Sequence, residues 1–141
     1  MISINEVTPS CKKEVESFKK IEWSLSDKEK EFKYNKKTYE RIAINKERIV
    51  GYTKYELLGG TAFLREIIVA KNARKQGIGK MLLEEFEKRA KKEGCHRCFL
   101  ETSEKHREAL KFYKKEKYKI IAKLKNHKFY VMWYIFSKEL T

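Results

Sequence analysis

Residues 74–80, with the sequence RKQGIGK, constrain the fold of this chain more than any other segment. They follow a strand-like apolar run at residues 64–69 and open a long helical pattern. Gly77 and Gly79 let the backbone approach a bound group without a Cβ in the way. The unpaired N–H groups and the positive dipole end of a starting helix favour an anion, and three basic side chains stand in the same segment. The pattern therefore predicts an anion-binding loop between a strand and a helix.

The helix that this loop opens, at residues 75–92, is the clearest predicted element. Ile78, Leu82, Phe86 and Ala90 recur at every fourth position and form one apolar stripe. Strands are expected at residues 2–7, 39–44, 48–57, 61–69, 96–102, 118–124 and 128–136, and further helices from Pro9 and from a cap at Ser103 to about residue 115. This order predicts an α/β fold with a mixed sheet and helices on its faces, whose central strand–helix–strand unit is parallel.

Length and composition limit the classes of protein to which this chain can belong. A length of 141 residues and an apolar share of 41% predict one globular domain over residues 1–141. The net charge of +14 predicts attraction to nucleic acid, an acidic membrane or a phosphorylated cofactor, although a generally lysine-rich surface explains it equally well. The three cysteines make no disulfide scaffold, the start lacks the apolar core of a signal peptide, and the longest apolar run is too short to span a bilayer. We therefore expect a soluble, cytoplasmic protein without membrane partners.

Three phosphate-binding patterns compete for residues 74–80. A P-loop needs a glycine where Arg74 stands and a Ser or Thr where Met81 stands, so this pattern is rejected. A dinucleotide fingerprint needs a third small residue where Leu82 stands. Its first glycine also belongs at the end of the strand, whereas Gly77 comes eight positions after Val69. Neither nucleotide pattern therefore fits.

The third pattern is Arg/Gln-x-x-Gly-x-Gly/Ala after a strand that ends in Val, which stands here as RKQGIG after Ile67-Ile68-Val69. It resembles the coenzyme A site of the GNAT family of N-acetyltransferases. Downstream, FLET at residues 99–102 looks like the next strand of that family, and ALKFYKK at residues 109–115 looks like its Ala-x-x-x-Tyr-Glu-Lys helix. The resemblance covers about residues 39–140 and implies the GNAT acyltransferase fold.

The chain departs from the family pattern at a few positions. His106 stands where the family often has Asn, and Lys114 stands where it often has Glu. Lys117-Tyr118 replaces the usual Gly-Phe, and Tyr118 can fill the aromatic role. His106 thus changes one side-chain contact to the cofactor but not the fold.

The resemblance implies acetyl-CoA as cosubstrate and a primary amine as acceptor, with no metal. The pyrophosphate is expected on the backbone amides of the loop, and the pantetheine arm beside the strand like an added strand. The backbone N–H of Ile67 would stabilise the oxyanion of the thioester carbonyl. The expected cofactor-binding residues are Ile67, Ile68, Val69, Arg74, Lys75, Gln76, Gly77, Ile78, Gly79, Lys80, His106 and Tyr113.

Three side chains are candidates for proton transfer. Tyr113 resembles the tyrosine that protonates the leaving thiolate, and its structural alternative is a buried helix tyrosine. Glu101, at the end of the strand facing the cofactor strand, is the first candidate base for the amine. Glu66, beside the oxyanion strand, is the second candidate. An ordinary strand-end carboxylate is an equally good reading of Glu101, and an enzyme that captures neutral amines needs neither.

Several functions stay open. The acceptor is not identified: a protein N-terminus, a lysine and a small amine all fit, and Trp23, Phe32 and Tyr34 in or near a charged helix or loop at residues 24–37 are candidate pocket residues. The alternative function is an inactive GNAT-fold module that binds nucleic acid or another anion, but the lysines are spread over the whole chain. The pair Cys95 and Cys98 is half a zinc site and predicts no metal. The apolar last strand is a candidate for homodimer contacts.

Overall fold

A computed structural model describes residues 1–23 and 36–141, and the chain divides into two compact units, Met1–Lys33 and Tyr34–Thr141. The first unit holds the 3₁₀ turn η1 (Pro9–Cys11) and the helix α1 (Lys12–Glu22). The predicted strand at residues 2–7 is wrong, because these residues have no regular structure and pair with no strand of the sheet. Most of the helix or loop expected at residues 24–37, including Phe32 and Tyr34, lies outside the described residues. One domain over residues 1–141 stays a prediction.

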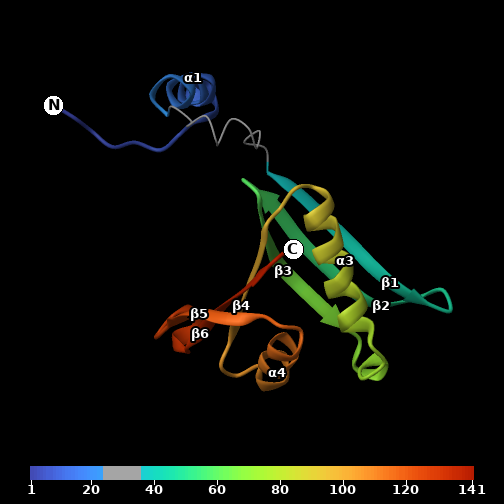
Figure 1. Ribbon diagram of the computed structural model, residues 1–141. Coiled ribbons are helices and arrows are strands. Elements are labelled where there is room, and N and C mark those ends of the chain that lie inside the picture. The colour runs from blue at the N-terminus through green and yellow to red at the C-terminus, as the bar shows by residue number, and fades with distance from the viewer. Residues whose placement is uncertain (24–35) are drawn as a thin grey trace. The chain divides into compact units, whose positions relative to one another are not determined.

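The second unit is built on a six-stranded mixed sheet of order β1-β2-β3-β4-β6-β5 (Figure 1). Neighbouring strands are antiparallel except β3 and β4, which are parallel, as the strand–helix–strand unit predicted. The strands are β1 (Lys37–Asn45), β2 (Arg48–Leu58), β3 (Thr61–Val69), β4 (Arg97–Ser103), β5 (Lys119–Leu124) and β6 (Trp133–Glu139). The mixed α/β fold is therefore confirmed.

The last strand differs from its prediction at its start. Residues Lys128–Tyr130 form the 3₁₀ turn η3, and β6 begins only at Trp133. Phe129 and Tyr130 have positive φ angles of 58° and 59°, which a strand does not accept. Because β6 lies between β4 and β5, both of its backbone edges are used within the sheet. The homodimer stays a prediction, and β6 has no free backbone edge with which to pair with a strand of a second copy.

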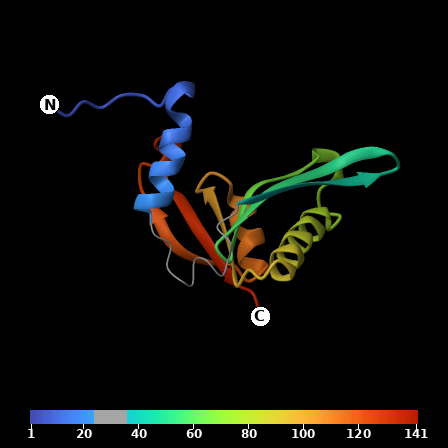
Figure 2. The same cartoon turned by 90° about the horizontal axis from the view of Figure 1, so that it is seen from above.

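Two helices pack on the sheet of the second unit. Helix α3 (Ile78–Lys92) lies along β1, β2 and β3, and α4 (Arg107–Lys115) follows β4 (Figures 1 and 2). Their apolar sides share one buried core with the strands. Each of five elements contributes a buried residue to it: Leu64 from β3, Phe86 from α3, Leu100 from β4, Tyr113 from α4 and Phe136 from β6. No helix in the described part of the chain combines the length and the apolar content that a bilayer span needs.

Both helices start later than predicted. Lys75 and Gly77 have φ angles of 60° and 81°, in the left-handed region, so α3 begins at Ile78 rather than near residue 75. Ser103 is not the cap of α4, because it is the buried last residue of β4 and the helix is preceded by His106, whose side chain forms no cap hydrogen bond. The loop before each helix thus leaves the first helical N–H groups without a side-chain cap.

Helix α3 approaches the sheet closely at Gly51 of β2. A Cβ at this position would lie 3.0 Å from Leu82 Cδ1 and 3.1 Å from Ile78 Cγ2. Real Cβ atoms rarely have contacts this short, so the glycine sets the distance between β2 and the first turn of α3. The loop at residues 74–77 is placed by that first turn.

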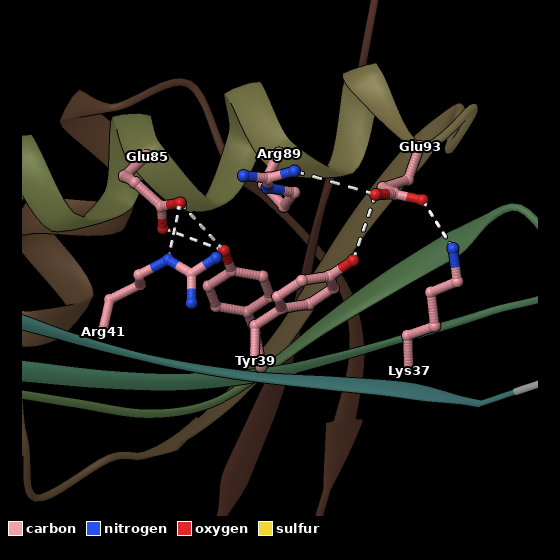
Figure 3. A network of polar contacts seen from close by, with 7 residues as sticks. Lys37, Tyr39, Arg41, Glu85, Arg89 and Glu93 are labelled. Atoms are coloured by element: carbon pink, nitrogen blue, oxygen red, sulfur yellow. Dashed lines mark hydrogen bonds and ion pairs between the residues drawn. The ribbon is translucent and has the colours of Figure 1, made fainter.

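A polar network holds the rest of α3 against β1 and β2 (Figure 3). The Tyr39 ring stacks on the Tyr55 ring at 5.4 Å, and its hydroxyl donates to Glu93 Oε1 at 3.0 Å. The Glu93 carboxylate also pairs with Lys37 Nζ at 2.8 Å. Further along the helix, the Tyr55 hydroxyl donates to Glu85 at 2.9 Å. These contacts hold α3 against β1 and β2 beside the buried core.

Glu85 is expected to contribute most to this network, because its carboxylate accepts the hydrogen bond of the fully buried Tyr55 and also pairs with Arg41 Nε at 3.3 Å. Burial, and then the hydrogen bond to Glu85, raise the pKa of Tyr55 above its ordinary value, so the phenol stays a donor. We expect Glu85→Ala to lower the free energy of unfolding by about 1–3 kcal/mol. Glu84→Ala, at the exposed neighbouring position, should stay within about 0.5 kcal/mol of the parent in urea unfolding. Equal losses would contradict a specific role for the Tyr55–Glu85 hydrogen bond.

Candidate active site

The strands β3 and β4 separate halfway along their length. They pair only between residues 61–64 of β3 and 97–100 of β4. On the other side of β3, Lys54 pairs with Glu66 and Tyr55 with Leu64, so Arg65 is an extra residue in a β-bulge. A bulge bends its strand, and Figure 2 shows the two halves of the sheet running apart. We call the space between residues 65–69 of β3 and 101–103 of β4 the splayed gap.

The backbone N–H of Ile67 faces this gap. Thr53 on β2 donates its hydroxyl to the Glu66 carbonyl oxygen at 2.9 Å, which places that carbonyl on the β2 side. The peptide bond is trans, so the following N–H, that of Ile67, points to the opposite side. The Ala70 N–H bonds to the Val50 carbonyl at 2.8 Å, in keeping with this alternation. An unpaired N–H of β3 is therefore available to a carbonyl or an extended ligand in the splayed gap.

The loop after β3 presents a set of unpaired N–H groups. The first helical hydrogen bond of α3 runs from the Met81 N–H to the Gly77 carbonyl at 3.0 Å, so the preceding N–H groups have no intrahelical acceptor. No side chain caps this end, and the first turn contains no acidic residue. With the positive dipole end of a 15-residue helix, this is the arrangement that binds phosphate groups.

Gly79 is not required by the packing of the protein. A Cβ there would lie 3.7 Å from Phe112 Cζ and 3.8 Å from Val69 Cγ2, which are ordinary contacts. Its backbone φ is not in the left-handed region, unlike that of Gly77. The missing side chain of Gly79 instead keeps open the space in front of the helix start.

A pocket of about 920 Å³ connects the splayed gap, the loop and α4. Its wall is strongly basic, with six Lys or Arg residues and two Glu. Among the described residues only one of the six cations has an ion-pair partner, since Lys80 lies 4.0 Å from Glu84. The six are Arg74, Lys75 and Lys80 from the loop and the start of α3, and Lys105, Arg107 and Lys115 from α4 and the residues before it. Such a pocket suits a ligand with several phosphate charges.

Tyr113 lies in the floor of the pocket, with 5% of its surface exposed. Its ring packs against Phe112, Tyr118 and Phe136 at 5.3–5.9 Å between centroids. Its hydroxyl forms no hydrogen bond within residues 1–23 and 36–141. Every buried side-chain oxygen in these residues has a hydrogen-bond partner, so the Tyr113 hydroxyl is not buried and reaches the open space of the pocket. Burial raises the pKa of Tyr113 to about 12. The side chain is thus a neutral hydrogen-bond donor with no acceptor among the described residues.

The two candidate bases lie on the other face of the sheet. Successive side chains of a strand alternate between faces, and Leu100 and Ile67 both pack with the core beneath the helices. Glu101 and Glu66, their neighbours in sequence, therefore project from the opposite face on the two strands that border the splayed gap. Neither lines the pocket. A donor bound in the pocket and an amine approaching from the opposite face would meet in the gap.

Most of the predicted cofactor residues line the pocket, and some side chains that line it were not predicted. Ile68 is exposed and does not line the pocket, and Gln76 is exposed in the loop without lining it. The predicted residues in the wall are Ile67, Val69, Arg74, Lys75, Gly77, Ile78, Gly79, Lys80, His106 and Tyr113. The sequence reasoning missed the basic side chains Lys105, Arg107 and Lys115 in and before α4, although the basic residues on both sides of His106 were a usable signal. The roles of all these residues stay predictions.

The cysteine pair gives no metal centre in the described residues. Cys95 and Cys98 are both buried, and burial raises the pKa of the Cys98 thiol to about 12. Metal ions bind the thiolate rather than the thiol. No group of three His, Cys, Asp or Glu side chains in residues 1–23 and 36–141 is arranged to hold an ion.

Comparison with known proteins gives the family. Residues 6–117 match the family described as the acetyltransferase (GNAT) family. The chain belongs to the GNAT acetyltransferases. The resemblance seen in residues 74–79 and 109–115 is thereby confirmed, and with it the relation to acyl-CoA-dependent acyl transfer. No curated protein matches the sequence at a significant level.

Solved structures show the same GNAT fold. An acetyltransferase from Bacillus cereus ATCC 14579 is 23% identical, with a TM-score of 0.78, over 99% of this chain and 98% of that one. The ribosomal-protein-S18-alanine N-acetyltransferase from Escherichia coli is 17% identical, with a TM-score of 0.68, over 74% and 70%. Ard1 from Thermoplasma volcanium is 22% identical, with a TM-score of 0.64, over 68% and 66%. At these identities the likeness is one of fold.

Proposed function

We propose that this GNAT protein transfers an acetyl group from acetyl-CoA to a primary amine. The observation that carries the proposal is the basic pocket, which joins an uncapped helix start, an unpaired N–H in the splayed gap and the free hydroxyl of Tyr113. Coenzyme A has a matching sequence of groups, namely phosphates, an amide-containing arm and a thioester. The family relation and the absence of acidic residues at the start of α3 support the same ligand.

The proposed binding mode uses each part of the pocket once. The pyrophosphate lies on the N–H groups at the start of α3, with Lys75 and Lys80 nearby. The pantetheine arm follows residues 67–69 as an added strand, using the backbone edge that β4 leaves unpaired. The thioester carbonyl then accepts a hydrogen bond from the Ile67 N–H, and its sulfur faces Tyr113.

The chemistry follows from the two faces of the splayed gap. An amine entering opposite the pocket loses a proton to Glu101 or, as the second candidate, to Glu66, directly or through water. Its nitrogen attacks the thioester carbon, and the Ile67 N–H stabilises the negative oxygen that forms. When the C–S bond breaks, the sulfur takes a proton from the Tyr113 hydroxyl, and the attacking nitrogen releases its second proton to water, from which Tyr113 regains its own. Glu101 is preferred as base because β4 pairs with β3 only up to Leu100, so Glu101 is the first residue of β4 that borders the splayed gap.

Acetyl-CoA binding is the direct test of the donor. We expect acetyl-CoA at 100 times its dissociation constant to stabilise the folded protein by about 2.7 kcal/mol, seen as a higher melting temperature. Acetate and inorganic pyrophosphate are the controls, since a general anion effect would appear with pyrophosphate alone. An unchanged melting temperature at millimolar acetyl-CoA would remove the donor assignment.

Measurement of turnover distinguishes an active acetyltransferase from the alternative, an inactive GNAT-fold module that binds an anionic partner. Consumption of acetyl-CoA over a panel of amines and peptides would identify the acceptor, with neutral or acidic molecules expected ahead of polycations because of the +14 charge. An inactive module would instead bind a nucleic acid with an affinity that falls steeply as salt is raised. Acetyl-CoA binding without turnover on any amine would favour that alternative.

A further inference from the structure

Lys128 lies where an acceptor amine is expected. We propose that Lys128 is an acetylation site of this protein, modified by its own active site in the same molecule. The inference rests on the proposed function, because it takes acetyl-CoA as donor and Glu101 as base. It adds an acceptor that the chain itself supplies and that does not depend on the identity of the external amine.

The Lys128 ammonium group is bound directly to the candidate base. Its Nζ forms an ion pair with Glu101 Oε1, although the two residues are 27 positions apart in sequence. Glu101 is the first residue of β4 past its last pair with β3, so this ion pair stands at the narrow end of the splayed gap. Of the primary amines in the described residues, Lys128 is the one paired with Glu101.

Trp133 keeps Lys128 in this position from two directions. The Lys128 Nζ lies 5.0 Å from the centre of the Trp133 ring, within the range of a cation–π contact. The Trp133 Nε1–H donates to the Lys128 carbonyl oxygen at 3.0 Å. Behind it, the loop is joined to the end of β4, because the Glu104 N–H donates to the Met132 carbonyl at 2.9 Å. Both the backbone and the side chain of Lys128 are thus held at the gap.

A tethered amine gains a large advantage over a free one. Well-oriented intramolecular reactants reach effective concentrations of about 10⁵–10⁸ M, whereas a loosely held group gains far less. The side chain of Lys128 is 51% exposed, so the four-carbon stem has room to turn the nitrogen from the carboxylate toward a thioester in the gap. The ion pair therefore holds the amine beside the reaction centre and leaves the Lys128 side chain free to turn toward the thioester.

The reaction balances with the groups already named. Glu101 accepts a proton from the Lys128 ammonium, and the free Nζ forms a C–N bond to the acetyl carbon of acetyl-CoA. The C–S bond breaks as the sulfur takes a proton from the Tyr113 hydroxyl, the attacking nitrogen releases its second proton to water, from which Tyr113 regains its own, and coenzyme A leaves as the thiol. The products are N-acetyl-lysine and coenzyme A. Acetylation removes the charge that pairs with Glu101 and frees that carboxylate.

Lys37 is a matched control within the same molecule. It also pairs with a carboxylate, Glu93, at 2.8 Å, and the exposed fractions of the two side chains are 55% and 24%, against 51% and 20% for Lys128 and Glu101. Lys37 lies on β1, however, two strands away from β3 and the gap. Chemical acetylation by acetyl-CoA should reach both lysines, since both are exposed and ion-paired, whereas the active site should select Lys128.

The test is the time course of acetylation of the full chain with isotopically labelled acetyl-CoA, read by peptide mass spectrometry. We expect label on Lys128 at a rate roughly 10²-fold or more above that on Lys37, in keeping with general acid–base catalysis. The rate constant should not change with protein concentration, because the amine and the site belong to one molecule. Lys128→Arg, which keeps the charge but has no acylatable amine, should lose this label, and Tyr113→Phe should slow it.

Four outcomes would overturn the inference. Equal labelling of Lys128 and Lys37 would indicate chemical acetylation, and a rate that rises with protein concentration would indicate transfer between molecules. Absence of label on Lys128 while acetyl-CoA raises the melting temperature would remove the internal acceptor and leave the proposed function intact. No rise in melting temperature with acetyl-CoA would instead remove the donor assignment, and the inference with it.

Discussion

Gly79→Glu should abolish acetyl-CoA binding and leave the fold intact. The new carboxylate would stand in the first turn of α3, where the pyrophosphate is proposed to lie. Two unit charges 4 Å apart repel each other by about 4 kcal/mol at the effective dielectric constant of a protein surface, which corresponds to roughly 10³-fold in affinity. The protein has space for the Cβ, and a negative charge is favourable at a helix start, so we expect no loss of stability.

The size and the charge of the new side chain can be separated. Gly79→Gln has the same length as Gly79→Glu without the charge, and Gly79→Ala adds only a methyl group. Calorimetric titration should rank acetyl-CoA affinity as parent, Ala, Gln and Glu, from tightest to weakest, with similar melting temperatures for the four unliganded proteins. If the glutamate variant binds as tightly as the parent, the pyrophosphate is not at the start of α3.

The strand, loop and helix around residues 74–80 were predictable because their signals are local. A strand that ends at Val69, two glycines and a 3.6-residue apolar period are read directly from the sequence, and the structure places β3 at the predicted residues. The true start of α3 was not readable, because it depends on positive φ angles at Lys75 and Gly77. Lysine carries no sequence signal for that conformation.

The splayed gap could not be predicted, because it depends on registry between strands. The bulge at Arg65 appears only when the pairing of Lys54 and Tyr55 with β3 is known. The ion pair between Lys128 and Glu101 could not be predicted either. A strand was expected from residue 128, whereas Lys128 lies in the 3₁₀ turn η3. By contrast, the position of Glu101 on the face opposite Leu100 follows from strand alternation and was within reach of the sequence, whereas Glu66 reaches that face only because of the bulge at Arg65.

Tyr113→Phe should lower kcat by roughly 10²–10⁴-fold and change acetyl-CoA affinity little, because it removes one hydroxyl that acts on the leaving sulfur. The ring packing is kept by phenylalanine, and the hydroxyl has no hydrogen bond to lose within the described residues. Melting temperature should therefore stay close to that of the parent. A loss of affinity as large as the loss of kcat would indicate that Tyr113 shapes the pocket instead.

Tyr118→Phe is the matched control. Tyr118 is as deeply buried as Tyr113, and the two rings lie 5.9 Å apart, but the Tyr118 hydroxyl donates to Glu87 at 3.0 Å and Tyr118 does not line the pocket. Removal of its hydroxyl should cost about 0.5–1.5 kcal/mol in the free energy of unfolding and leave kcat unchanged. The two variants thus have opposite expected effects, one on catalysis and one on stability. Equal losses of kcat in both would contradict the assignment of Tyr113.

The pH dependence adds a second readout. Burial raises the pKa of Tyr113 to about 12, which means that its deprotonated form is disfavoured and the phenol keeps its proton up to that pH. Between about pH 6 and pH 10 the hydroxyl should therefore not titrate, and the ratio of parent to Tyr113→Phe kcat should be constant over that range. A phenol with a lowered pKa would behave differently, since its donor capacity would fall as the pH rises and the two activities would converge. A ratio that shrinks toward pH 10 would show that Tyr113 loses its proton in the working enzyme, and that the six pocket cations overcome the effect of burial.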